Sequence, residues 1–198
     1  MSAINETVAD VLEQSLAGAR LQSPIRAVGV AGSPRAPSKS KTLAERFLAA
    51  LQRLGCETRL IDVATLPAEA LVVRETSADI DDALGAVGQA QIIVASTPTY
   101  RATYTGVLKC FFDLMPQGHL AGKVCVGLQT GIASAHALSP EYGLRPLFAS
   151  LEGLPVLTIY ATDAEFDSGE PNAELSERIH RAAEQAVQVA HGLSSGEA

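Results

Sequence analysis

Hydroxyl and basic side chains gather in one short stretch of this chain. Residues 32–42 read GSPRAPSKSKT, with one glycine, several hydroxyl residues and an arginine followed by two lysines. Ser33, Ser38 and Ser40 offer hydroxyl donors, and Arg35 offers a planar charged fork that suits phosphate oxygens. The stretch is neither a dinucleotide-binding G-x-G-x-x-G motif nor a Walker A loop, because it has one glycine and no G-K-[ST]. It therefore predicts a cradle for a monophosphate rather than a pyrophosphate.

The segments on either side of this stretch explain how it is positioned. Residues 25–31 are short and apolar, as a buried strand of a parallel sheet should be. After the stretch, apolar residues recur with helical spacing at Leu43, Phe47, Leu48 and Leu51. The loop thus leads from a strand to the amino end of a helix, where free N–H groups and the helix dipole favour a dianion. A plainer alternative stays open, in which Ser38 or Ser40 merely caps the helix.

Length, charge and cysteine content restrict the class of protein. A chain of 198 residues with 47% hydrophobic content suits one α/β domain. The net charge of −7 and the lack of a Lys/Arg-rich run argue against a nucleic-acid partner. No apolar run reaches the roughly 20 residues of a membrane span, and the N-terminus does not resemble a signal peptide, so we expect a cytoplasmic protein. Cys56, Cys110 and Cys125 are widely spaced and are expected to be free, buried thiols.

Strand and helix patterns alternate along the chain. Strands are predicted at residues 25–31, 57–63, 91–96, 123–128 and 156–160. Further helices are predicted at residues 80–87, 104–115, 138–151 and 174–191, and residues 67–79 are interpreted as an irregular connection. This alternation predicts an α/β fold: a flavodoxin-like doubly wound sheet of five parallel strands in the order 2-1-3-4-5, with helices on both faces.

The two ends of the chain are predicted to lie outside this domain. Residues 1–24 form an N-terminal extension, the domain covers residues 25–192, and residues 193–198 have the composition of a disordered tail. In the extension, Ile4, Val8 and Leu16 fall on helical spacing. An extra helix and a frayed tail both stay open, because a lone helix of this length is marginal without packing.

Two more loops are expected beside the first, because ligands of this architecture bind at the carboxyl ends of the strands. The third strand leads into Pro98, Thr99 and Tyr100, and the fourth into Thr130 and Gly131. Pro98 stiffens the backbone, Tyr100 offers a flat surface, and Gly131 lets backbone N–H groups approach a ligand. A phosphate at one end and a flat, hydrogen-bonding ring at the other predict FMN. The alternative is an ordinary strand-to-helix turn with Tyr100 packed on its neighbours.

Over residues 25–165 the chain resembles the NAD(P)H-dependent FMN reductases. Within them it is most similar to the reductase component of two-component alkanesulfonate monooxygenase systems. The residues that carry the resemblance are Gly32-Ser33-Pro34-Arg35-x-Pro37-Ser38-x-Ser40, Thr97-Pro98-Thr99-Tyr100, Tyr104-x-Gly106-x-Leu108-Lys109, Asp113-Leu114-x-Pro116, Gly122-Lys123-Val124, Thr130-Gly131 and Ala135-His136.

The resemblance implies an activity and a set of roles. It implies an NAD(P)H:FMN oxidoreductase, with NADPH or NADH as hydride donor, whose FMNH2 goes to a partner flavin-dependent monooxygenase, and it implies a homotetramer. The phosphate would be held by Ser33, Arg35, Ser38 and Ser40. The ribityl chain and ring would be lined by Pro98, Thr99, Tyr100, Thr130 and Gly131. Tyr142 resembles a tyrosine that some members place in a π-helical bulge at the tetramer interface, although a half-buried interface tyrosine is an equal alternative.

No catalytic acid, catalytic base or metal ligand is assigned. Hydride transfer asks for stacking geometry, exclusion of water and backbone donors rather than a titrating side chain. Compared with the family that it resembles, the chain differs at Gly131-Ile132, where the most similar members carry two glycines, and Ile132 is expected to narrow the ring pocket or alter FMN affinity. Two rival functions stay open: a quinone or azo reductase that retains FMN, and a non-enzymatic flavodoxin-like electron carrier.

Overall fold

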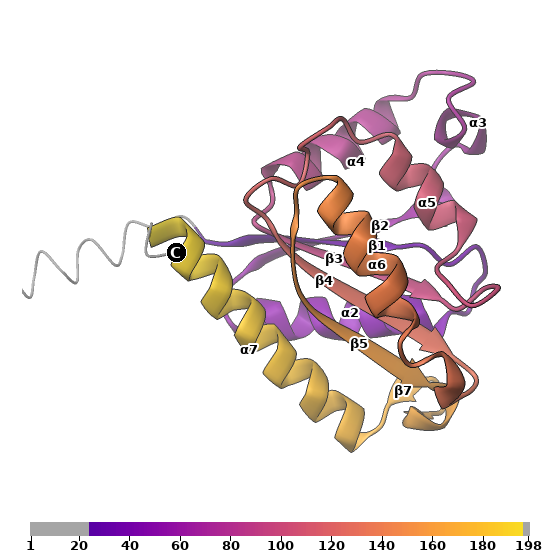
Figure 1. The fold of residues 1–198 in the computed structure, drawn as a ribbon, viewed down its shortest axis with the longest axis vertical. Helices are drawn as coiled ribbons and strands as arrows, with labels where there is room; N and C mark the ends of the chain where they lie inside the picture. Colours follow the sequence, from indigo (N-terminus) through magenta and orange to yellow (C-terminus); the bar gives the residue numbers. More distant parts are fainter. Residues whose placement is uncertain (1–23, 196–198) are drawn as a thin grey trace, which may run out of the picture.

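A computed structural model describes residues 24–195, which fold around one parallel sheet with helices on both faces (Figure 1). The strands are β1 (Arg26–Ala31), β2 (Glu57–Asp62), β3 (Ile92–Pro98), β4 (Val124–Gly131) and β5 (Leu154–Thr162). Their order is β2-β1-β3-β4-β5, and each neighbouring pair is parallel. The predicted flavodoxin-like sheet is therefore confirmed in strand number, order and direction.

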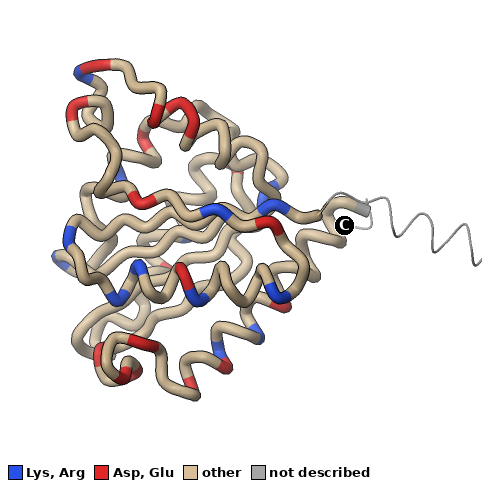
Figure 2. The backbone as a smooth tube through the Cα atoms, turned by 180° about the vertical axis from the view of Figure 1, so that it is seen from behind, with Lys and Arg blue, Asp and Glu red and all other residues tan. Residues whose placement is uncertain are grey.

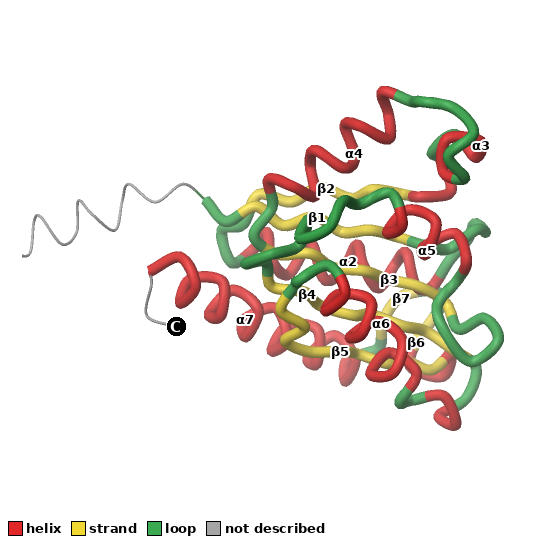
Figure 3. The backbone as a smooth tube through the Cα atoms, turned by 45° about the horizontal axis from the view of Figure 1, so that its top comes forward, coloured by secondary structure: helices red, strands yellow, loops and turns green. Residues whose placement is uncertain are grey.

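Helices form a layer on each side of the sheet (Figure 3). One face packs against α2 (Lys39–Arg53) and α7 (Ala173–Ser195). The other packs against α4 (Ala78–Gln89), α5 (Gly106–Asp113) and α6 (Ser139–Ser150). The shorter elements are η1 (Val63–Thr65), α3 (Ala68–Leu71), η2 (Ser134–His136), η3 (Asp163–Glu165), β6 (Phe166–Asp167) and β7 (Glu170–Pro171).

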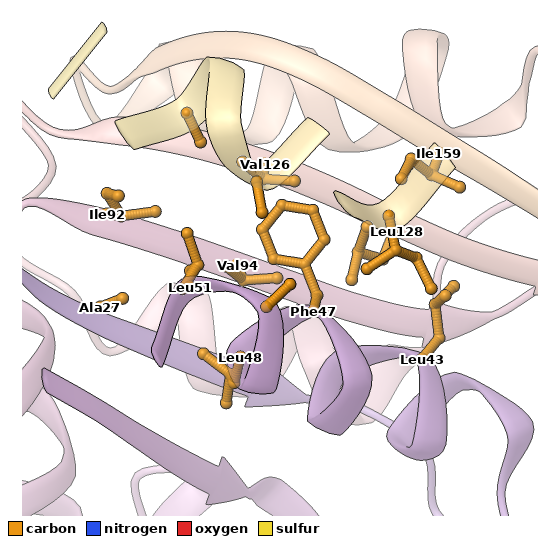
Figure 4. Packing of buried hydrophobic residues seen from close by; sticks show 14 of the residues in the cluster. Ala27, Leu43, Phe47, Leu48, Leu51, Ile92, Val94, Val126, Leu128 and Ile159 are labelled. Atoms are coloured by element: carbon orange, nitrogen blue, oxygen red, sulfur yellow. The ribbon is translucent and has the colours of Figure 1, made fainter. Parts of the chain in front are cut away.

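Alternation along the central strands builds a core on each face. Val94, Val126 and Leu128 belong to the cluster on the α2 side, where the ring of Phe47 packs among them (Figure 4). Cys125 belongs to the cluster on the opposite side. Successive side chains of a strand point to opposite faces, so strands covered on both faces must be apolar almost throughout. Burial of both faces leaves the strand ends as the accessible part of the sheet.

All three cysteines are free, as predicted. Cys56 and Cys125 are buried, whereas Cys110 is only half-buried. Burial raises the pKa of the Cys125 thiol to about 12, which keeps this sulfur protonated and unreactive.

Several predicted boundaries differ from the structure. The irregular connection at residues 67–79 contains the short helix α3. Strand β5 begins at Leu154, because an irregularity next to Pro155 lets this edge strand accept a proline. The prediction of a tail from residue 193 is wrong for its first residues, since α7 continues to Ser195. Of the predicted extension at residues 1–24, residues 1–23 lie outside the described residues, as do residues 196–198 of the predicted tail.

Charge is mixed over the surface. Apart from α2, along which Lys39, Lys41, Arg46 and Arg53 outnumber Glu45, the basic residues are scattered among acidic ones in Figure 2. Within residues 24–195, no helix combines the length and the apolar character that crossing a membrane requires.

Candidate active site

A cavity of about 390 Å³ opens at the carboxyl ends of β1, β3 and β4. Most of the predicted binding residues line it: Ser33, Arg35, Ser38, Ser40, Pro98, Tyr100 and Thr130. The first and third strands are neighbours in the sheet, and the chain leaves β1 toward one face and β3 toward the other. The cavity thus lies at the topological switch point, where doubly wound proteins bind their ligands.

The loop after β1 is folded by its own hydroxyl groups. The Ser33 hydroxyl donates to the Arg35 carbonyl at 3.1 Å, and Ser38 is the N-cap of α2, accepting from the Lys41 N–H at 3.3 Å. The Ser38 and Ser40 hydroxyl oxygens are 3.0 Å apart. The capping role considered for Ser38 is therefore present, and the same residue also lines the cavity. Among the described residues, Arg35 has no ion-pair partner, so its guanidinium is available to an anion.

Close packing of α5 fixes the start of this loop. A Cβ atom on Gly32 would lie 2.5 Å from the Leu108 Cβ atom, so only glycine fits there. The Gly32 carbonyl accepts a hydrogen bond from the Thr105 hydroxyl, and its N–H donates to the Ser96 carbonyl at 2.8 Å. The Ser96 hydroxyl donates to the Ser40 carbonyl at 2.6 Å. The loop between β1 and α2 is thus hydrogen-bonded to β3 and to the amino end of α5.

Thr99 joins the second loop to the third. Its N–H and its hydroxyl donate to the Thr130 carbonyl at 2.7 and 2.9 Å, and its hydroxyl oxygen accepts from Gln129 Nε2 at 2.9 Å. Thr99 is not part of the cavity lining, so its role in this structure is to hold Thr130.

Tyr100 stands at the mouth of the cavity. It is 38% exposed, which differs from the alternative of a tyrosine packed on its neighbours. Its N–H donates to the Thr103 carbonyl at 2.8 Å, closing a tight turn. Arg101 and Ala102 in this turn have φ of 51° and 67°, which is unusual and strained for residues other than glycine. The aromatic ring is therefore presented by a stiff turn.

Gly131 makes room for a protein side chain. A Cβ atom there would lie 2.0 Å from the Tyr160 hydroxyl oxygen, and this hydroxyl donates to the Ala133 carbonyl at 2.8 Å. Gly131 does not line the cavity. Ile132 is 87% exposed and also lies outside the lining, so the expected narrowing of the ring pocket by Ile132 is not seen.

Sequence reasoning missed one wall of the cavity. Lys39, Asp163 and Gly169 also line it, and the last two come from the segment after β5. There β6 and β7 form a short antiparallel hairpin, whose turn residues Ser168 and Gly169 have φ of 51° and 92°. The Ser-Gly pair is a turn signal that could have located the hairpin. The packing of this hairpin against α2 is a tertiary contact, so no local sequence pattern predicts it.

The π-helical prediction for Tyr142 is wrong for this chain. Helix α6 is α-helical from Ser139 to Ser150, and the Tyr142 N–H donates to the Leu138 carbonyl at 3.2 Å, the ordinary α-helical spacing. The Tyr142 side chain is 79% exposed, so it is not half-buried within a single chain.

The residues present fit a flavin mononucleotide. The end suited to phosphate has hydroxyl groups, the amino end of α2 and the Arg35 guanidinium, which has no ion-pair partner within residues 24–195, while the other end has an exposed aromatic ring beside Thr130. Among the described residues, no cluster of three or more His, Cys, Asp or Glu side chains is arranged to hold a metal ion.

The sheet order and the position of the cavity define an α/β protein of the flavodoxin-like class. The sequence model described as NADPH-dependent FMN reductase matches residues 25–167, and the chain belongs to this family. It is 34% identical over 173 residues to the NADH-dependent FMN reductase SfnF of Pseudomonas fluorescens, covering 84% of this chain and 92% of the relative. It is 35% identical over 161 residues to an FMN reductase (NADPH) of Pseudomonas putida, covering 77% and 82%.

A solved structure agrees with this assignment. The apo form of the NADH:FMN oxidoreductase EmoB superposes with a TM-score of 0.76 at 31% identity, covering 82% of this chain and 88% of that chain. The protein is therefore an oxidoreductase, and the electron-carrier alternative is not supported.

Proposed function

We propose that this flavin reductase, which oxidises NADPH or NADH and reduces FMN, releases the reduced flavin to a separate flavin-dependent monooxygenase. The observation that carries the proposal is the open cavity, whose aromatic wall, Tyr100, is 38% exposed. A site that leaves part of its ligand in solvent suits a flavin that must leave after each turnover. The resemblance to reductase components of two-component systems supports the same conclusion.

The phosphate end of the proposed site is built on α2. Arg35 supplies the charged fork, and Ser33, Ser38 and Ser40 supply hydroxyl groups beside the helix amino end. Each element of this end acts by binding, and none takes a proton. Its function is to anchor the flavin so that the ring lies at the opposite end of the cavity.

The ring end is assigned to the other two loops. Pro98, Tyr100 and Thr130 line it, and Thr99 and Gly131 act by positioning Thr130 and the chain that follows. When bound, FMN supplies an N5 atom that accepts hydride from the nicotinamide C4. We assign Thr130, which lines the cavity, to the stabilisation of negative charge on the ring, by the logic of an oxyanion hole; Gly131 does not line the cavity. Stacking against Tyr100 orients the two rings and excludes water between them.

Steady-state kinetics test whether FMN leaves. NADPH and NADH oxidation by flavin-free protein are measured as free FMN is varied, and again with a quinone at limiting FMN. Release of reduced FMN predicts saturation in FMN and converging lines in a double-reciprocal plot. Turnover that follows the quinone, with FMN retained and parallel lines, would instead establish a quinone reductase on this scaffold.

A homotetramer is part of the proposal. Ile132, Leu138 and Tyr142 are large apolar or aromatic side chains that are 87%, 63% and 79% exposed, and all three lie in the stretch 132–142 that follows β4. Exposed apolar side chains gathered in one region favour burial against a second copy. Light scattering on a size-exclusion column should give four times the chain mass, and Tyr142→Glu should lower it. A monomeric wild type would remove this part of the proposal.

The proposed location is the cytoplasm. The three cysteines are all free, which suits a reducing compartment. Cell fractionation followed by assay of NAD(P)H-dependent FMN reduction tests it, and activity confined to a membrane or exported fraction would contradict it.

A further inference from the structure

One carboxylate lies in the wall of the cavity that we assign to a phosphate. The charged side chains that line this cavity are Arg35, Lys39 and Asp163. Lys39 Nζ lies 3.1 Å from Asp163 Oδ1 and also donates to the Asp163 carbonyl oxygen at 3.4 Å. One of the two lining cations is therefore already paired, whereas Arg35 has no acidic partner in the described part of the chain.

Asp163 is held by a well-supported turn. It follows Thr162, whose N–H and hydroxyl both donate to Glu165 Oε2, at 2.7 and 2.9 Å. The hairpin that follows is attached to α2 by two hydrogen bonds of 2.6 Å from Arg46 to Glu170. In Figure 2 the acidic residues of this segment lie together beside α2. The carboxylate therefore has a fixed place next to the amino end of the helix.

Lys39 also contacts the hairpin that follows Asp163. Its Nζ atom lies 5.7 Å from the centroid of the Phe166 ring, within reach of a cation–π contact. Its side chain and that of Asp163 are 37% and 48% exposed, so the pair is partly screened by solvent. Because the ion pair is only partly exposed, Asp163 still competes with a bound phosphate for Lys39. Because it is partly screened, Lys39 can move from Asp163 to the phosphate.

We propose that Asp163 sets the affinity and the phosphate selectivity of the flavin site, by holding Lys39 and by opposing a bound phosphate dianion. This inference rests on the proposed function. A carboxylate near a dianion repels it, and a lysine shared between the two contributes less to each. Asp163 thus weakens FMN binding specifically through its phosphate, which favours release of the reduced flavin. Riboflavin has no phosphate, so Asp163 should not change its affinity for the site.

Binding of two flavins separates this role from others. The dissociation constants of FMN and riboflavin are measured by quenching of flavin fluorescence, without nicotinamide, for wild type and Asp163→Asn. We expect the substitution to lower the FMN Kd about threefold to tenfold, as removal of one partly screened charge should. The riboflavin Kd should stay within about twofold, and the gain for FMN should shrink at high salt.

Two further variants control the experiment. Asp167→Asn removes a carboxylate charge from the hairpin that follows Asp163, but Asp167 is exposed and does not line the cavity, so this variant should leave the FMN Kd unchanged. Lys39→Gln should raise the FMN Kd, and adding Asp163→Asn to it should give a smaller gain than in wild type, because the freed lysine is missing. Asp163→Ser provides a second neutral side chain, and circular dichroism verifies the fold of each variant.

The outcomes that overturn the inference are distinct. Weaker FMN binding by Asp163→Asn would make the carboxylate a support for the site rather than an opponent of phosphate. If Asp163→Asn changed the riboflavin Kd as much as the FMN Kd, Asp163 would act on the ring or the ribityl chain rather than on the phosphate. If Asp167→Asn changed the FMN Kd equally, the effect would come from the net charge of the protein and not from the position of Asp163. An unchanged FMN Kd overturns it as well. If the wild type bound neither flavin, both the proposed function and the role of Asp163 would be contradicted. The steady-state kinetics described above test the proposed function alone.

Discussion

The two ends of the sheet carry hollows that differ in size and in charge balance. A groove of about 630 Å³ at the amino ends of β1 and β2 is larger than the cavity of about 390 Å³ at the carboxyl ends. In the groove, Arg26 lies 3.7 Å from Glu57 and Arg59 pairs with Asp82, so its cations are matched by acids. In the cavity, Arg35 is unmatched within the described residues.

This difference shows that size alone does not identify a ligand site. Among the described residues that line the groove at the amino ends, both arginines are already paired with carboxylates, so neither is available to an incoming anion. The cavity at the carboxyl ends combines hydroxyl groups, a helix amino end and a cation, Arg35, that is unpaired in the described part of the chain, and each of these interacts favourably with an anion. Substitutions made in pairs, one at each end of the sheet, can therefore test the assignment.

The largest effect is expected from Arg35→Ala. Loss of a charge-assisted hydrogen bond to phosphate should weaken FMN binding by about 1.5–3 kcal/mol, or roughly 10- to 150-fold in Kd. Arg59→Ala at the other end should leave the FMN Kd unchanged. Fluorescence titration measures both. If the two variants had the same FMN Kd, Arg35 would not be part of the site. The cavity would then not differ from the groove in its binding of FMN.

Glycine-to-alanine substitutions at the two ends of the sheet should change the free energy of unfolding in opposite directions. Gly131→Ala forces the Tyr160 hydroxyl away from Ala133 and should destabilise the fold by about 1–3 kcal/mol. Gly85→Ala, in α4 beside the groove, meets nothing within 4 Å and should stabilise it by about 0.5–1 kcal/mol. Urea unfolding measures both. A neutral Gly131→Ala would show that the contact with Tyr160 is dispensable.

Thr105→Val tests how firmly the phosphate loop is held. Thr105 is 1% exposed, caps α5 and donates to the Gly32 carbonyl, so its loss should cost about 1–2 kcal/mol of stability. Thr58→Val in the groove is the matched control and should stay within about 0.5 kcal/mol. Thermal unfolding by calorimetry compares them, and similar melting temperatures would mean that the Thr105 hydroxyl contributes nothing.

The smallest effect is expected at Asp82. Its hydrogen bond to Arg59 holds the pKa of the Asp82 carboxyl below its ordinary value of 3.8. A lowered folded-state pKa means that the pair stabilises the fold above about pH 4 and that this contribution is lost as the pH falls through the folded-state pKa. Asp82→Asn should slightly lower the melting temperature at pH 7 and should lower it less at pH 2. A loss of equal size at both values would show that packing, not charge, is involved.

Much of the fold followed from local patterns. The apolar strands and the helical stripe at Leu43, Phe47 and Leu51 led to the correct sheet order, because burial on both faces leaves a strong signal. The convergence of the three loops is confirmed by the pairing of Pro98 with Thr130 and by the bond from Gly32 to Ser96. The binding roles of the lining residues stay predictions.

Other features had no reliable local signal. The π-helical turn at Tyr142 rested on resemblance, and the chain forms an ordinary α-helix there. The start of β5 was missed because Pro155 reads as a strand breaker, although an edge strand accepts it. Thr99 and Gly131 were assigned to the ligand, but their contacts in this structure are with Thr130 and Tyr160.

The sequence by itself determined the class of fold and the position of the hydroxyl-rich loop between β1 and α2. Both depend on periodicity and on residue types within a few positions of each other, which act before any tertiary contact forms. Only the tertiary structure decided which charges meet. Lys39 and Asp163 are 124 positions apart, and their pairing depends on how the hairpin after β5 packs against α2. Charge balance in the cavity is therefore a property of the folded chain.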